Sequence, residues 1–168
     1  MKLEGLGLTG AVDNIWHRTT TNLTFLERLH LKENSLKGSI PREWGKMRHL
    51  RELDISFNQL TGTLPFDLFG VHGAMGPEHA NGLNLTMLNL ARNRLSGNIP
   101  ATVTNMTDLL DLNLASNHLT GPLPPFLNRL EQLTSLQLQG NRLQGPLPPA
   151  VTDMPKLRVL DLGGNRLR

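Results

Sequence analysis

Residues 109–124 read Leu-Leu-Asp-Leu-Asn-Leu-Ala-Ser-Asn-His-Leu-Thr-Gly-Pro-Leu-Pro. Residues 133–148 repeat the same frame, with leucine, asparagine, glycine and proline at the same places. The asparagine of this frame recurs at intervals of 24, 35, 24, 24 and 24 residues along the chain. These asparagines are Asn34, Asn58, Asn93, Asn117, Asn141 and Asn165. A period of this size is typical of repeat proteins.

Seven frames, complete or partial, cover the chain. Counted from each asparagine, apolar residues fall at minus 8, minus 5, minus 3, plus 2 and plus 6, with glycine at plus 4 and proline at plus 7. The first frame is degenerate, because Leu6 occupies the asparagine position while Leu3 and Leu8 stay in register. Most residue types in the frame are therefore explained by packing.

The frame predicts one short strand and one turn per repeat. Leu112, Asn113 and Leu114 alternate apolar and polar residues, as a half-buried strand does. The asparagine follows at the corner, where the backbone loses its ladder partners and a buried side chain that donates and accepts is needed. We expect the six asparagines to stack as an internal ladder. Proline at plus 7 suits the first position of a short helical turn, and the apolar spacing of three after it favours 3₁₀ turns.

The pattern L-x-x-L-x-L-x-x-N-x-L-x-G-x-[IL]-P resembles the leucine-rich repeat, and its Gly-x-Ile/Leu-Pro tail resembles the plant-type subclass. The resemblance implies a right-handed α/β solenoid, with a parallel β-sheet on the concave face and short 3₁₀ or irregular turns on the convex face. We expect a single domain over residues 1–168, with about seven repeats and incomplete first and last frames. The uncapped leucines at both ends indicate a segment of a longer array or ends that associate with another molecule.

Composition and sequence signals narrow the function classes. The chain has no cysteine, so it contains neither a disulfide nor a thiolate metal site. It shows no signal peptide and no apolar run long enough to span a membrane. We therefore expect a cell-surface protein if a longer receptor-like chain carries this segment, and alternatively a cytoplasmic one. The net charge of +3 comes from interleaved acidic and basic residues without a basic, aromatic-rich stripe, which argues against nucleic-acid binding.

The outward positions of the predicted strands are the candidates for ligand binding, because the scaffold positions are occupied by packing residues. At minus 4 these candidates are His30, Asp54, Asn89, Asn113, Gln137 and Asp161. At minus 6 they are Arg28, Glu52 and Asp111. Such polar rows suit an extended peptide or a protein surface. Phe57 is the aromatic residue nearest this face, and aromatic anchors are otherwise scarce.

A second candidate surface follows each asparagine. The residues at plus 1 in four consecutive repeats are Arg94, His118, Arg142 and Arg166. This row is interpreted either as a docking ridge for an acidic partner or as a solvated edge. Plant-type peptide receptors resemble this arrangement in using arginines to hold a ligand carboxylate. Here, however, Arg92 and Arg94 flank the asparagine Asn93 and do not lie along a strand.

The long interval contains eleven extra residues, which places an inserted loop at about 70–82. His72, Glu78 and His79 in this loop lack a fixed geometry, so we expect no metal site and no cofactor. Three Asn-x-Thr sequons, at Asn22, Asn84 and Asn105, are possible glycosylation sites.

The chain carries no nucleophile elbow, phosphate-binding loop, H-E-x-x-H motif or cysteine nucleophile. We therefore expect a non-catalytic module, although the resemblance extends to receptor kinases, whose kinase would lie elsewhere in a longer polypeptide. Two functions remain. The first is recognition of a peptide or protein partner, and the alternative is an assembly scaffold whose ends associate with each other.

Overall fold

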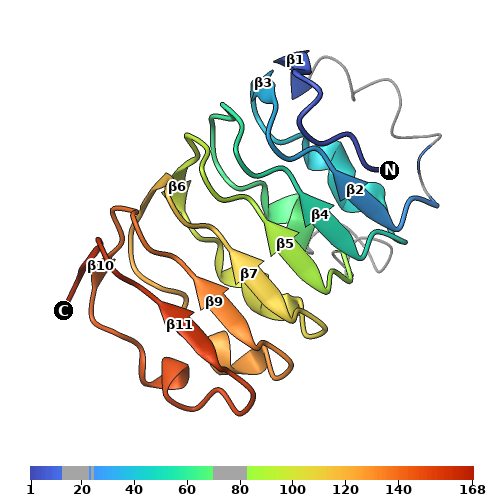
Figure 1. The fold of residues 1–168 in the computed structure, drawn as a ribbon. Helices are drawn as coiled ribbons and strands as arrows, with labels where there is room; N and C mark the ends of the chain where they lie inside the picture. Colours follow the sequence, from blue (N-terminus) through green and yellow to red (C-terminus); the bar gives the residue numbers. More distant parts are fainter. Residues whose placement is uncertain (13–22, 24, 70–82) are drawn as a thin grey trace.

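The computed structural model describes residues 1–12, 23, 25–69 and 83–168. The expected loop insertion and the sequon at Asn22 lie outside these ranges. Within them the chain forms a curved, right-handed solenoid whose repeats stack in sequence order (Figure 1). This architecture agrees with the fold class that the repeat frame predicts.

Among the described residues, the main sheet has six parallel strands of three residues each, ordered as they follow one another in the chain. They are β2 (Arg28–His30), β4 (Glu52–Asp54), β5 (Met87–Asn89), β7 (Asp111–Asn113), β9 (Ser135–Gln137) and β11 (Val159–Asp161). Equivalent frame positions pair directly: Leu29 lies opposite Leu53, Leu53 opposite Leu88, and Leu112 opposite Leu136. The repeat frame therefore sets the register as well as the fold, and it keeps the register across the 35-residue interval from Leu53 to Leu88.

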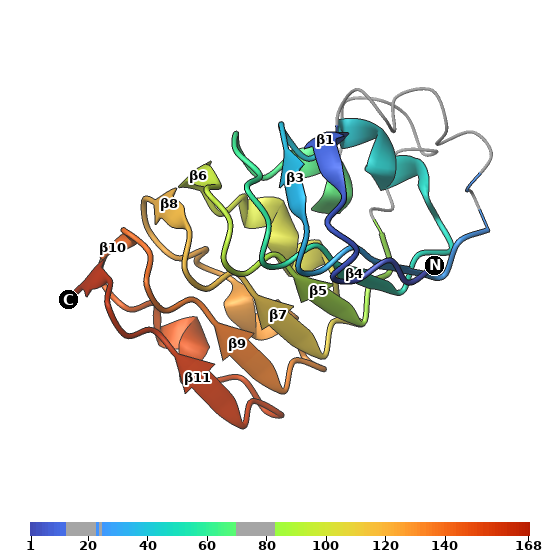
Figure 2. The ribbon, with the colours of Figure 1, turned by 45° about the horizontal axis from the view of Figure 1, so that its top comes forward.

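Two-stranded parallel pairs lie beside the main sheet, beyond the asparagine corners (Figure 2). They join β1 (Thr9–Ala11) to β3 (Ser35–Lys37), β6 (Ser96–Asn98) to β8 (His118–Thr120), and β10 (Gln144–Gly145) to β12 (Arg166–Leu167). Short 3₁₀ turns cover the opposite, convex side. They are η2 (Arg42–Lys46), η3 (Phe66–Phe69), η5 (Ala101–Asn105), η6 (Leu127–Arg129) and η7 (Pro149–Val151).

The prolines at plus 7 take a slightly different place from the expected one. Pro41, Pro100 and Pro148 are the cap residues that precede η2, η5 and η7, and each has extended backbone with φ between −62 and −65°. The expectation of proline at the first helical position was therefore wrong by one residue. An extended residue is what proline favours, and the chain needs one where it leaves the second row of strands.

The core is one continuous cluster of buried leucine, isoleucine, valine, methionine and aromatic side chains. Trp44 and Met47 are fully buried and replace leucines of the frame, as does Met106 at 2% exposure. Each repeat alone leaves one apolar side uncovered, and stacking buries that side against the next repeat. At the end of the stack, Val159 and Leu160 of β11 are 49% and 43% exposed.

The asparagine ladder connects the repeats along the corner. Asn93 donates through Nδ2 to the carbonyl oxygens of Ile55, Leu90 and Ala91 at 3.0–3.4 Å, and its Oδ1 accepts from the backbone N–H of Leu60 at 2.9 Å. The other five asparagines make the same type of contacts with their own repeat and with the repeat before it. Each one thus satisfies backbone groups that the corner separates from the sheet.

Candidate functional site

The candidate ligand-binding residues lie in two straight rows across the main sheet. Strand pairing sets Arg28 opposite Glu52, Glu52 opposite Met87, and Met87 opposite Asp111. The minus 4 row runs in the same way from His30 on β2 to Asp161 on β11. Side chains of a strand alternate between its two faces, so these rows face away from the buried leucines. The structure brings all of these candidates onto one surface.

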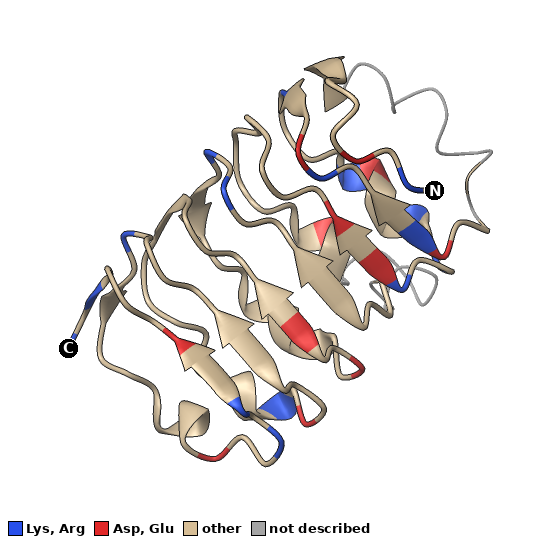
Figure 3. Ribbon diagram, viewed as in Figure 1, with Lys and Arg blue, Asp and Glu red and all other residues tan. Residues whose placement is uncertain are grey.

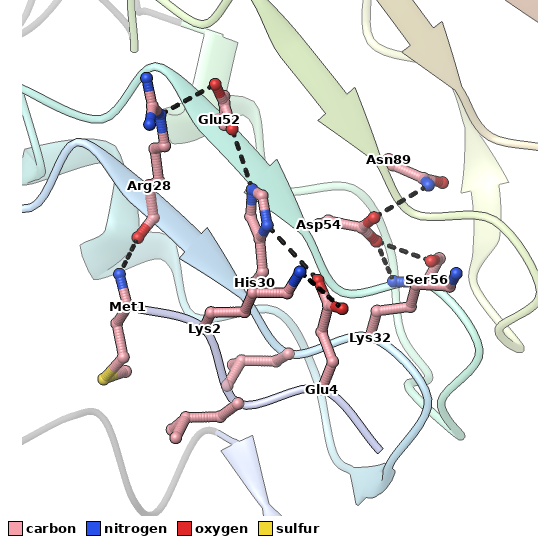
Figure 4. A network of polar contacts seen from close by, with 12 residues as sticks. Met1, Lys2, Glu4, Arg28, His30, Lys32, Glu52, Asp54, Ser56 and Asn89 are labelled. Carbon is pink, nitrogen blue, oxygen red and sulfur yellow. Dashed lines mark hydrogen bonds and ion pairs between the residues drawn. The ribbon is translucent and has the colours of Figure 1, made fainter. Parts of the chain in front are cut away.

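A network of polar side-chain contacts crosses the first repeats (Figure 4). His30 contacts two carboxylates: its Nε2 lies 3.0 Å from Oε2 of Glu52, and its Nδ1 lies 3.5 Å from Oε1 of Glu4. Glu52 also pairs with Nε of Arg28 at 3.0 Å, and Glu4 with Nζ of Lys2 at 3.4 Å. These contacts join the N-terminal segment, β2 and β4, and they engage three of the candidate residues with one another.

The minus 4 residues also serve their own backbone. Oδ1 of Asp54 accepts from both the backbone N–H and the hydroxyl of Ser56, at 2.9 and 2.6 Å. The side-chain oxygens of Asn89, Asn113 and Asp161 likewise accept from the backbone N–H two residues later, at 3.0–3.2 Å. These bonds close the end of each strand. In addition, Asn89 donates through Nδ2 to Oδ2 of Asp54 at 3.2 Å, which links neighbouring repeats.

Two acceptor atoms on the same face lack a hydrogen-bond partner within the described ranges. They are Oδ1 of Asp111 and Oε1 of Gln139, and both are buried. Burial raises the pKa of the Asp111 carboxyl above 3.8, while a hydrogen bond with Ser135 opposes this shift and the charge of Asp54 adds to it. An unpaired buried acceptor is unfavourable, so the middle of the sheet favours a donor from water or a ligand.

Phe57 lies at the corner beside this face and is 41% exposed. Lys32 Nζ lies 5.5 Å from the centre of its ring, and Arg92 Cζ lies 4.9 Å from it. Lys32 also pairs with Glu33 at 3.1 Å, and the hydrogen bond and charge of Glu33 raise the pKa of Lys32. We name Lys32, Phe57 and Arg92 the cation–aromatic cluster.

The residues at plus 1 form a row along the neighbouring edge. The backbone N–H of each donates to the preceding repeat, as His118 does to the carbonyl oxygen of Leu95 and Arg142 to that of Leu119, both at 2.8 Å.

We name Arg92, Arg94, His118, Arg142 and Arg166 the basic edge; all five residues are exposed. Figure 3 shows basic residues along this edge without acidic residues among them, from β6 to the C-terminus. The sequence segments that build it, 91–100, 115–124, 139–148 and 163–168, contain no Asp or Glu.

Two of the three sequons lie within the described residues. Asn84 is exposed just before β5. Asn105 ends η5, is partly buried, and donates through Nδ2 to the carbonyl oxygen of Phe69 at 3.3 Å. The histidines and glutamate of the insertion lie outside the described ranges, and no cluster of metal-ligating side chains occurs inside them.

Sequence reasoning missed Glu4 as a site residue, and it did not predict that Lys32 and Arg92 meet at Phe57. Glu4 belongs to the degenerate first frame, and its contact with His30 requires the two segments to stack. Lys32 and Arg92 stand near Phe57 only because three successive repeats place them there. An unused signal was the frame position directly before the asparagine, which holds Phe57 and Arg92 in two repeats and Gly140 and Gly164 in two others.

Comparisons with known proteins agree with this architecture. Leucine-rich-repeat family models match residues 25–47, 46–63 and 83–143, which together make up more than half of the chain. The chain belongs to the leucine-rich-repeat family.

Its relatives are plant receptor proteins. The chain is 32% identical over 100 residues to Receptor-like protein 31 of Arabidopsis thaliana. The aligned region covers 51% of this chain and 12% of that protein. The ectodomain of the Arabidopsis receptor kinase HAESA, solved with an IDA peptide hormone, is 30% identical with a TM-score of 0.85, covering 99% of this chain and 25% of that one. The plant peptide hormone receptor RGFR1, solved with RGF2, is 34% identical with a TM-score of 0.81, covering 95% and 23%. The chain therefore resembles a segment of a plant receptor-like protein and spans a small part of its relatives' length.

Proposed function

We propose that this chain is a non-catalytic recognition module that binds a peptide or protein partner on its concave strand face and the adjacent edge. The main support is the alignment of polar side chains in straight rows, one per repeat, with Asp111 Oδ1 and Gln139 Oε1 unpaired among the described residues. Rows of donors and acceptors at the strand spacing suit an extended partner, whose own backbone and side chains repeat regularly. The peptide complexes of its structural relatives support the same class of partner.

Charge on this face favours a partner with donor groups at its centre. From β4 to β11 the minus 6 and minus 4 rows carry Glu52, Asp54, Asp111 and Asp161 and no basic residue. Arg28, His30 and Lys32 are confined to the first strand and the corner after it, where Arg28 and His30 contact Glu52. We infer that the middle of the sheet receives N–H groups or a cationic side chain of the partner.

We also propose an extracellular or cell-surface location, because the relatives are receptor-like proteins and receptor ectodomains. Within the described ranges, no helix has both the length and the apolar character needed to cross a lipid bilayer.

A library of synthetic peptides screened against the purified chain tests the recognition function. The double variant Asn113→Arg with Gln137→Arg places two bulky cations on the concave face and should abolish binding of any peptide that the wild type selects. Asn128→Arg with Thr107→Arg makes the same charge change at exposed positions on the convex side and should leave binding intact. Equal binding by both double variants, or no selected peptide at all, would refute recognition by the concave face.

Assembly through the ends is the second proposed function, supported by the exposure of Val159 and Leu160 on the edge strand β11. Exposed apolar edge strands pair readily with another chain, here a second copy. Light scattering of the wild type and of Leu160→Arg tests this. Concentration-dependent growth that the substitution removes supports assembly, and a monomer at every concentration contradicts it.

A further inference from the structure

Four repeats hold a side chain at a backbone position that favours glycine. Glu33, Phe57, Arg92 and Ser116 stand directly before a ladder asparagine and have φ angles of 57, 54, 53 and 55°. The next two repeats have Gly140 and Gly164 there, with φ angles of 69 and 67°. An L-residue in this left-handed region is strained, and a bulky residue such as phenylalanine is an outlier there. Retained strain of this kind is a reason to look for a role of the side chain.

Phe57 and Arg92 meet each other at this position. Arg92 lies over the Phe57 ring at 4.9 Å, and Lys32 of the preceding repeat lies over it at 5.5 Å. Because the repeats stack in sequence order, the two cations approach the ring from the preceding and the following repeat. Both cations therefore lie within cation–π distance of a ring that stays 41% exposed.

This geometry decides which class of partner fits. Single-stranded nucleic acids bind by stacking bases on aromatic faces, and here two cations compete for the ring of Phe57. An apolar side chain of a peptide packs well against the exposed part of the ring. Arg92 favours a carboxylate beside that apolar residue, whereas Lys32 is already paired with Glu33 at 3.1 Å.

The basic edge continues from Arg92 in one direction. Arg94, His118, Arg142 and Arg166 follow at one residue per repeat, a spacing of about 4.8 Å, as set by the strand ladder. No acidic residue interrupts the segments that carry them. Like charges lined up on one edge add their fields and attract an anionic chain.

We propose that the cation–aromatic cluster and the basic edge form one docking surface for an acidic, extended segment of a partner protein. An apolar side chain of that segment contacts the exposed part of the Phe57 ring, and its carboxylates lie along Arg94, His118, Arg142 and Arg166. This inference rests on the proposed recognition function and names the chemistry of the partner at the edge.

Charge reversal tests the basic edge. The probe is a fluorescent synthetic peptide of alternating glutamate and serine with one leucine at its end, and the comparison peptide has glutamine for glutamate. Arg94→Glu with Arg142→Glu should weaken binding of the acidic probe at least about tenfold, and raising the salt to about 0.5 M should weaken binding to the wild type. Arg129→Glu in η6 with Arg158→Glu just before β11 changes the net charge equally away from the basic edge and should change affinity less than about twofold.

Glycine substitution tests the cluster without the risk of unfolding. Phe57→Gly removes the ring and relieves the left-handed strain, so the variant should fold as well as the wild type but bind the acidic probe about tenfold more weakly. Ser116→Gly makes the matched backbone change outside the cluster and should keep full binding.

The outcomes separate this inference from the recognition function itself. Unchanged probe affinity in the edge variant and in Phe57→Gly overturns the acidic docking surface, while loss of peptide binding in Asn113→Arg with Gln137→Arg still supports the concave face. Preferential binding of polygalacturonate over the acidic peptide also overturns it, because the partner would then be a carbohydrate. Tight binding of the glutamine peptide would show that charge does not direct the contact.

Discussion

The side-chain amide of Asn117 donates to the carbonyl oxygen of Leu90 at 3.0 Å, and Leu90 belongs to the preceding repeat. In the opposite sense, Oδ1 of Asn117 accepts from the backbone N–H of Leu95 at 3.0 Å, again in the preceding repeat. Every ladder asparagine therefore ties its own repeat to the one before it. Deleting one side chain opens a defined junction between two repeats.

We expect Asn117→Ala to lower the free energy of unfolding by about 1 to 3 kcal/mol, because buried backbone groups lose their partners. Asn165→Ala is the matched control. Asn165 lies in the last repeat and is less buried, so its substitution should lower the free energy of unfolding by less. Urea denaturation followed by circular dichroism measures both. If both variants lost a negligible amount of free energy of unfolding, water would be able to replace the hydrogen bonds of the asparagine side chain.

Gly45→Ala should destabilise the convex side by about 1 to 3 kcal/mol. A Cβ at Gly45 in η2 would collide with the backbone carbonyl of Asp67 in η3, and a backbone atom has little freedom to move. Gly163→Ala is the control, because its Cβ would approach the side chain of Asp161 at 3.3 Å without a backbone clash. Thermal unfolding of both variants checks the prediction, and a Gly45→Ala protein as stable as the wild type would contradict it.

The raised pKa of Asp111 predicts a specific pH dependence. Burial makes the folded state hold the proton more tightly than the unfolded state, so this carboxyl stabilises the fold most below pH 3.8. That contribution is lost as the pH rises through the raised pKa. Asp111→Asn should therefore gain stability relative to the wild type as the pH increases from about 4 to about 7. Denaturation at several pH values measures the difference, and a constant difference would refute the prediction.

Glycosylation should occur at Asn84 rather than at Asn105. Asn84 is exposed, whereas the side-chain amide of Asn105 is engaged with the carbonyl oxygen of Phe69. In a secretory host, Asn84→Gln should remove a mobility shift that glycosidase treatment also removes, and Asn105→Gln should not. The comparison is made in an Asn22→Gln background, so that the remaining sequon does not contribute. A shift lost only in Asn105→Gln would reverse the assignment.

The repeat frame predicted the strands, the 3₁₀ turns and the alignment of the outward rows, because a constant period places equivalent residues opposite one another. It did not predict that Asp54, Asn89, Asn113 and Asp161 use a side-chain oxygen to hold their own strand ends. A polar residue on an outward row looks the same in a sequence whether it binds a ligand or its own backbone. Which of the two it does depends on where the neighbouring amide points after the strand ends.

The sequence by itself determined the architecture, since leucine, asparagine, glycine and proline at a fixed spacing leave one way to bury the apolar positions of every repeat at once. It also determined which residues share a row. Only the tertiary structure decided which side chains of different repeats meet: His30 between Glu4 and Glu52, and Phe57 between Lys32 and Arg92. These contacts join residues that lie 22 or more positions apart, and stacking alone brings them together.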